Sequence, residues 1–78
     1  MKEKIEEELK EEIEAVRSGI ARIKRSLDNL EYALSKENYA LAEVIAGGIE
    51  LKAIWLEKSI ETLKNWKKKQ DKEHEGEN

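Results

Sequence analysis

Residues 39–56 read YALAEVIAGGIELKAIWL, and this stretch decides the fold. The helix that it would form is apolar on nearly every side, interrupted only by Glu43, Glu50 and Lys52. A helix that is apolar all round has to be buried by other elements. The preceding half of the chain offers a single apolar stripe, which can cover only one side of it. The remaining apolar surface therefore predicts a second copy of the chain or a different protein partner.

The first half of the chain carries an unbroken heptad pattern. Its apolar residues are spaced alternately four and three apart, which is typical of the seam of a coiled-coil-type helix. This spacing predicts a helix over about 2–34. A stripe of small residues, Gly19, Ser26 and Ala33, flanks the seam and would let another helix approach closely. The seam residues are Leu9, Ile13, Val16, Ile20, Ile23, Leu27, Leu30 and Leu34.

The polar segment 35–38 separates the two apolar runs, and both Ser35 and Asn38 are suitable N-caps for a second helix. A connection this short makes the two helices antiparallel neighbours. We expect the second helix over about 39–69, with facing residues whose numbers sum to about 73. Its expected seam residues are Ala42, Ala46, Ile49, Ala53, Leu56, Ile60 and Leu63. The polar tail, residues 71–78, should be disordered. The predicted fold is thus all-α: an antiparallel two-helix hairpin over 1–70 that dimerises into a four-helix bundle.

Composition supports assembly. A chain of 78 residues rarely builds a core worth more than about 3–5 kcal/mol without staples. There is no cysteine, so disulfides are excluded, and oligomerisation is the source of additional stability that we expect. The absence of cysteine and of a signal-like N-terminus indicates a cytoplasmic protein, and the Lys/Glu richness is a weak indication of a thermophilic source. The charges within 39–56 argue against a membrane span.

Several large apolar residues of the second helix stay unused once the hairpin seam is assigned. We expect them to form the oligomer interface. Gly47 and Gly48 at its centre allow three readings: a bend, close packing of a straight helix, or approach of a ligand. Trp55 is either an interface anchor or a stacking platform for a base or sugar. The predicted interface residues are Leu41, Val44, Ile45, Gly48, Leu51, Ile54 and Trp55.

Two basic clusters are candidate contacts for nucleic acid or another anion. The second of them surrounds Trp66 and would also lie beside the acidic residues 1–16, which hold seven Glu against three Lys. Neutralisation by those carboxylates, or plain solvation, is the alternative reading. With a net charge of −3 the chain as a whole does not favour nucleic acid. The candidate residues are Arg17, Arg22, Lys24 and Arg25, and Lys64, Lys67 and Lys68.

Nothing in the sequence supports catalysis. The single histidine, His74, lies in the polar tail, so no base is placed beside a nucleophile. The Glu-x-x-His pair of di-iron bundles is missing as well. We therefore expect no enzyme activity, no metal site and no bound cofactor.

Three functions remain open. The first is a small interaction or scaffold protein that acts through self-association and through a protein partner. The second is an RNA- or DNA-binding hairpin dimer, similar in architecture to the plasmid-encoded RNA-binding bundles of the Rop type. The third is a regulator that inserts the acidic face of residues 6–14 into a basic site of another protein.

Overall fold

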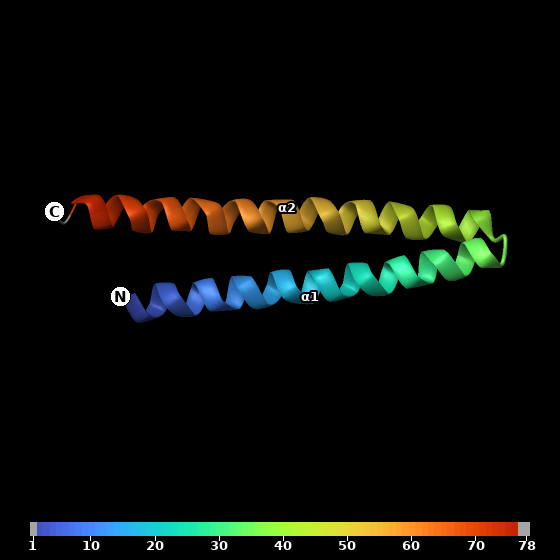
Figure 1. The fold of residues 1–78 in the computed structure, drawn as a ribbon, viewed down its shortest axis with the longest axis horizontal. Coiled ribbons are helices and arrows are strands. Elements are labelled where there is room, and N and C mark those ends of the chain that lie inside the picture. Colours follow the sequence, from blue (N-terminus) through green and yellow to red (C-terminus); the bar gives the residue numbers. More distant parts are fainter. Residues whose placement is uncertain (1, 77–78) are drawn as a thin grey trace.

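The computed structural model describes residues 2–76, with side chains described over residues 6–71. Two helices, α1 (Lys2–Ser35) and α2 (Tyr39–Gly76), pack antiparallel into a rod whose Cα extents are 62 × 17 × 12 Å (Figure 1). The predicted all-α hairpin is confirmed. α2 continues without interruption through Gly47 and Gly48, and no helix among the described residues is long and apolar enough to cross a bilayer.

The turn is fixed by hydrogen bonds at both helix ends. The Asn38 N–H donates to Ala33 O at 2.9 Å and the Glu37 N–H to Leu34 O at 3.0 Å, the two bonds of a Schellman motif. Glu37 has the left-handed φ of 55° that this motif requires at its C′ position. Asn38 then caps α2, because its Oδ1 accepts the N–H of Leu41 at 3.2 Å. Of the two N-cap candidates the structure uses Asn38.

The hairpin seam differs from the expected one by a rotation of both helices. The seam residues of α1, all with reduced exposure, are Leu9, Glu12, Val16, Gly19, Ile23, Ser26, Leu30 and Ala33. Those of α2 include Ala42, Ile45, Ile49, Lys52, Leu56, Ser59, Leu63 and Trp66. Numbers of facing residues therefore sum to about 75, as in the contact between Gly19 and Leu56. The expected sum of 73 was therefore wrong: on each helix the second row of the seam is the neighbouring one.

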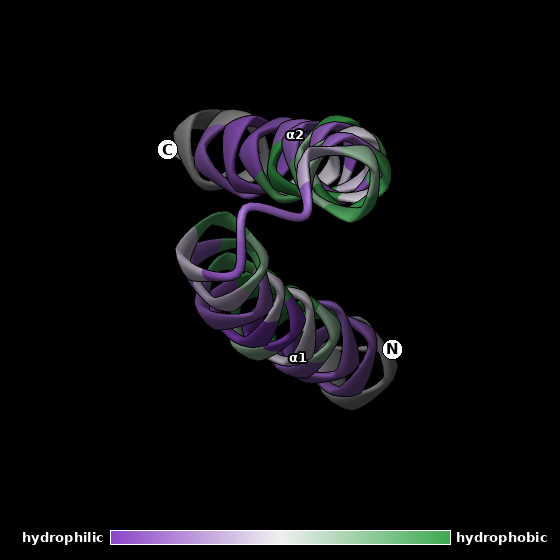
Figure 2. Ribbon diagram, turned by 90° about the vertical axis from the view of Figure 1, so that its right-hand side faces the viewer, coloured by the Kyte–Doolittle hydropathy of each residue, from purple (hydrophilic) through white to green (hydrophobic). Residues whose placement is uncertain are grey.

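The physical reason is the stripe of small residues. Gly19, Ser26 and Ala33 turn inward and let α2 approach closely, and Ala33 is only 1% exposed. Large residues of α2 fill the space that the small ones leave, as Leu56 does opposite Gly19. Far from the turn, the facing residues Leu9 and Trp66 are larger. The two helices lie further apart there and are inclined to each other (Figures 1 and 2).

α2 extends further than expected. It continues to Gly76, seven residues past the expected end at 69 and through most of the segment expected to be disordered. The added stretch, from Gln70 to Glu75, holds neither proline nor glycine, so no residue there breaks the helix. Residues 77–78 of that segment lie outside the described residues.

Candidate functional site

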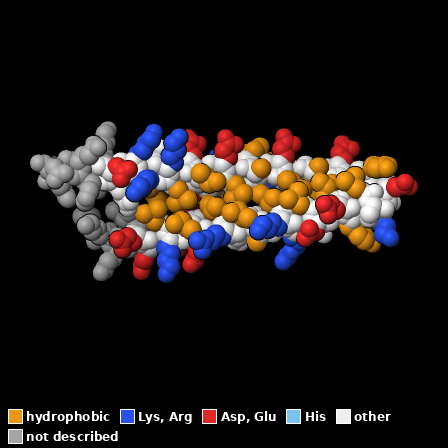
Figure 3. Space-filling model, viewed as in Figure 1, with side chains coloured by type: hydrophobic (Ala, Val, Ile, Leu, Met, Phe, Trp, Pro, Cys, Tyr) orange, Lys and Arg blue, Asp and Glu red, His pale blue; other side chains and the backbone are white. Residues whose placement is uncertain are grey.

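The rotation of the seam leaves a long apolar side on the hairpin, which we call the Ile20 face. On α1 it consists of Ile13, Ile20, Leu27 and Leu34, spaced by seven and 40–49% exposed. On α2 it consists of Tyr39, Ala46, Ala53 and Ile60, also spaced by seven and exposed. Figure 3 views the hairpin from this side and shows a continuous band of hydrophobic side chains over both helices.

Charged residues of opposite sign border the two edges of the Ile20 face. Each border residue follows a seam residue by one position, which turns it toward this face and outward from the other helix. The α2 edge is acidic at its centre, with Glu43, Glu50 and Glu57 followed by Lys64. The α1 edge is basic at its centre, with Lys10, Arg17 and Lys24 followed by Glu31.

The opposite side of the hairpin, which we call the Trp55 face, holds most of the predicted interface residues. Leu41, Gly48 and Trp55 lie beside the seam, and Val44 and Leu51 lie one row further out, at 72% and 71% exposure. Ile54 points to the outer side of α2 at 46% exposure. Ile45 does not join them, because it is half-buried in the hairpin seam. The apolar part of this face belongs to α2 alone.

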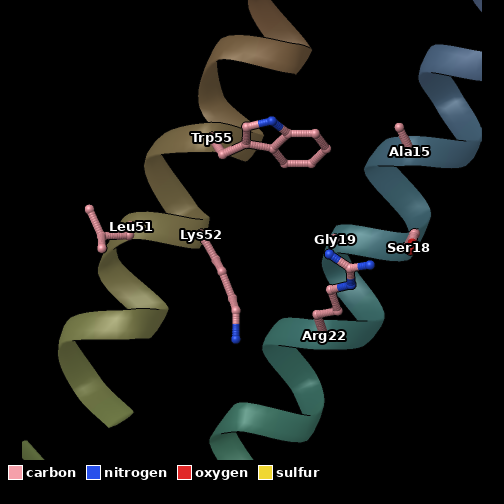
Figure 4. Close-up of a pocket in the computed structure, with 7 residues that line it drawn as sticks. All are labelled: Ala15, Ser18, Gly19, Arg22, Leu51, Lys52 and Trp55. Carbon is pink, nitrogen blue, oxygen red and sulfur yellow. The ribbon is translucent and has the colours of Figure 1, made fainter. Parts of the chain in front are cut away.

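An open pocket of about 470 Å³ lies between the helices on the Trp55 face (Figure 4). Its α1 wall is made of small residues plus one cation, and its α2 wall combines apolar and cationic side chains. Trp55 reaches across toward α1. A Cβ on Gly19 would lie only 3.0 Å from Trp55 Cζ3. The lining residues are Ala15, Ser18, Gly19, Arg22, Leu51, Lys52 and Trp55.

Lys52 occupies a seam position, where an apolar residue would be ordinary. Its Nζ donates to Ser26 Oγ at 2.8 Å, and both groups are partly buried. Among the described side chains, no ion pair joins α1 to α2; the one ion pair there is Lys67 with Asp71 at 3.7 Å on the exposed surface of α2. Lys52 is thus a half-buried cation whose hydrogen-bond partner is neutral.

The candidate nucleic-acid contacts do not form one surface. Arg17 and Lys24 border the Ile20 face, whereas Arg22 lines the pocket on the Trp55 face. Arg25 lies three residues beyond Arg22, on the same outer side of α1. The lysines near the end of α2 also lie on different sides. Lys64 borders the Ile20 face, Lys67 continues the α2 row of that face seven residues after Ile60, and Lys68 points outward.

The described residues offer no group of three or more His, Cys, Asp or Glu able to hold a metal ion. The heptad pattern did not indicate the Ile20 face as a free surface, because it predicts Ile13, Ile20, Leu27 and Leu34 inside the hairpin. The small stripe 19, 26, 33 was the signal that could have revealed it. No protein-family model matches the chain, and neither a curated protein nor a solved structure is significantly similar to it.

Proposed function

We propose that this chain is a non-catalytic interaction protein whose working unit is a dimer of hairpins, a four-helix bundle closed through the Ile20 face. One observation carries the proposal. Within the described side chains only Val16, Ala33 and Ala42 are buried hydrophobics, whereas twelve large hydrophobic side chains are exposed. Six of the twelve lie together on the Ile20 face, and a monomer rarely exposes so many large apolar side chains in one band. The absence of cysteine supports a cytoplasmic setting for such a dimer.

The Ile20 face has the extent that a dimer needs. The row from Ile13 to Leu34 spans about 32 Å at 1.5 Å per residue, and the molecule is 17 Å wide in its second dimension. Two copies packed over this area would bury roughly 1,000 Å², which is the lower limit for a specific interface. The Trp55 face offers its apolar residues on one helix only, so we assign the dimer to the Ile20 face.

Side-chain size favours one of the two symmetric ways to pair these faces. The α1 row is large throughout, whereas the α2 row is small at its centre, where Ala46 and Ala53 lie. With α1 of each copy over α2 of the other, Leu27 covers Ala46 and Ile20 covers Ala53. The opposite pairing stacks Ile20 on Leu27 and Ala46 on Ala53, which leaves voids beside overpacked layers. The favoured dimer therefore has both turns at the same end.

Charge favours the same pairing at the centre of the interface. With α1 over α2, Arg17 of one copy meets Glu57 of the second, and Lys24 meets Glu50. In the register that stacks Ile20 on Leu27, the opposite pairing places Lys24 beside Lys24 of the second copy, and Glu50 beside Glu50 of the second copy. Like charges meet in the proposed dimer only at its two ends, beyond the centre of the apolar band. Exposed pairs contribute about 0–1 kcal/mol each, enough to choose an orientation but not to hold a dimer.

The chain has no native cysteine, so paired cysteines report the orientation directly. Arg17→Cys with Glu57→Cys places thiols on opposite edges of one hairpin, too far apart for a disulfide within it. In the proposed dimer the two thiols meet across copies, so mild oxidation should yield a covalent dimer. The matched variant Lys24→Cys should stay uncrosslinked, because the thiols at position 24 of two copies meet only when the turns lie at opposite ends.

Light scattering of the unmodified chain at micromolar concentration tests self-association itself. A stable monomer would end the proposal. If the control variant crosslinks instead, self-association is supported, but the proposed packing of α1 over α2 is refuted. If the chain is a dimer and neither variant crosslinks, the interface is formed by the residues predicted from the sequence: Leu41, Val44, Gly48, Leu51, Ile54 and Trp55.

A nucleic-acid-binding dimer is the second candidate function. The proposed dimer leaves Arg22 and Arg25 free on the Trp55 face of each copy, next to an exposed indole, and this placement favours it. Phosphate contacts would make the affinity fall steeply with salt. The absence of any gel shift with RNA or DNA at low salt would end this reading.

A further inference from the structure

The pocket on the Trp55 face has the dimensions and the composition of a ligand site. Its volume of about 470 Å³ lies within the range of small-molecule sites, roughly 300–1,000 Å³. It lies on the side of the hairpin opposite the Ile20 face, so the proposed dimer would leave it open. It is present in a single hairpin, so this inference requires only that the Trp55 face stays uncovered, as it does in a monomer and in the proposed dimer.

The aromatic wall of the pocket is held in place by α1. The indole of Trp55 reaches across to Gly19, and Leu56 packs on the same glycine from the seam (Figure 4). A Cβ at position 19 would lie 3.0 Å from Trp55 Cζ3 and would require the indole to shift, so the glycine permits this close approach. Ala15 and Leu51 are the other apolar residues of the lining, and the Leu51 side chain points away from α1 (Figure 4). A flat apolar group could stack on the indole ring, since offset stacking is the arrangement that aromatic pairs favour.

The pocket is cationic as well as apolar. Arg22 and Lys52 line it, and no carboxylate does. Figure 4 shows Lys52 extending into the space between the helices and the Arg22 guanidinium beside Gly19. Lys52 is half-buried, and the hydrogen bond to Ser26 Oγ does not compensate its charge. An anion at this point would pair with Lys52 and with Arg22, and hydrogen bonds between oppositely charged groups are stronger than the bond to a neutral hydroxyl.

We propose that this pocket binds a small planar anion, an aromatic carboxylate in chemical class. The ring stacks on Trp55, and the carboxylate lies between Arg22 and Lys52. A guanidinium donates two parallel hydrogen bonds to a carboxylate, whereas the lysine ammonium acts as a point charge. A free inorganic anion would leave the apolar wall unused, and a neutral ring would leave both cations unpaired.

The test uses the full chain and two naphthalene probes of equal ring size. 1-Naphthoate carries the anion, and 1-naphthalenemethanol is its neutral analogue. The readout is the indole Nε1–H resonance of Trp55 in a nitrogen–proton correlation spectrum, assigned with Trp66→Phe because the chain has two tryptophans. Saturable shifts of this resonance are expected with 1-naphthoate and at least about tenfold weaker binding with the alcohol, the scale of a charge-assisted hydrogen bond.

Four variants locate the anion. Arg22→Gln and Lys52→Met should each weaken 1-naphthoate binding by about tenfold. Arg25→Gln removes a cation from the same side of α1 but not from the pocket lining, and should leave the affinity unchanged. Ser26→Ala frees Lys52 from its hydroxyl partner while keeping the charge, so binding should persist or tighten. Equal affinity for the alcohol and 1-naphthoate, equal affinity in Arg22→Gln, or no saturation at millimolar 1-naphthoate would overturn the proposal.

Discussion

The three helical glycines give the sharpest test of the hairpin packing, because one substitution has opposite expected outcomes. A Cβ added at Gly47 or Gly48 meets nothing within 4 Å. A Cβ added at Gly19 meets Leu56 Cδ2 at 2.9 Å and Trp55 Cζ3 at 3.0 Å. The helix gains about 1 kcal/mol when alanine replaces an interior glycine, at any of the three positions.

At Gly47 and Gly48 nothing offsets that gain, so Gly47→Ala and Gly48→Ala should each raise the free energy of unfolding by about 1 kcal/mol. At Gly19 the gain is opposed by overpacking against Leu56, which is half-buried in the seam. Overpacking of a well-packed contact costs about 1–3 kcal/mol. Gly19→Ala should therefore be neutral or destabilising, by as much as about 2 kcal/mol.

Urea unfolding followed by far-ultraviolet circular dichroism gives these free energies by linear extrapolation. All variants have to be compared at one protein concentration, because the stability of a dimer depends on concentration. If Gly19→Ala stabilises the chain as much as Gly47→Ala does, Trp55 and Leu56 do not pack on Gly19. If Gly48→Ala destabilises while Gly47→Ala stabilises, another chain packs against Gly48, and the Trp55 face is the dimer interface.

Three further substitutions test the turn and the Ile20 face. Asn38→Ala removes the acceptor of the Leu41 N–H and should lower the free energy of unfolding by about 1 kcal/mol, measured by urea unfolding. Glu37→Gly relieves the left-handed φ of 55° and should raise it by about 1 kcal/mol; a loss of stability would contradict the turn geometry. Ile20→Glu should weaken the dimer by more than about 100-fold in a sedimentation dilution series, since two isoleucines lose about 1.5–3 kcal/mol of burial each. Arg25→Glu, outside the face, is its control and should dimerise normally.

The hairpin itself could be predicted from the sequence. Heptad spacing indicated both helices, and the polar segment 35–38 indicated the antiparallel turn. These signals are local: spacing within one helix, and the chemistry of four consecutive residues. The C-terminal bound of α2 was harder to predict, because the polar residues after Lys69 permit a helix and also resemble a disordered tail.

The rotation of the seam could not be read from hydrophobicity alone. One row of α1, from Leu9 through Val16, Ile23 and Leu30, belongs to the seam in either arrangement. The second row is either the large one that contains Ile20 or the small one that contains Gly19. Hydrophobicity selects the large row, whereas close approach of the two helices selects the small one. Pocket residues such as Lys52 and Ser26 depended on this choice, so the sequence did not bring them together.

The large row of α1, which the hairpin seam does not use, is informative about assembly. Selection of large apolar residues at positions 13, 20, 27 and 34 is not needed to close the hairpin, since small residues do that at 19, 26 and 33. Four exposed large residues at a strict spacing of seven would stabilise nothing in an isolated hairpin and would reduce its solubility. Their physical use is a second helical layer, and the small centre of the α2 row is the complement that such a layer requires. In the proposed dimer the two rows of α1 therefore have different roles: the small row packs the chain on itself, and the large row would pack it on its copy.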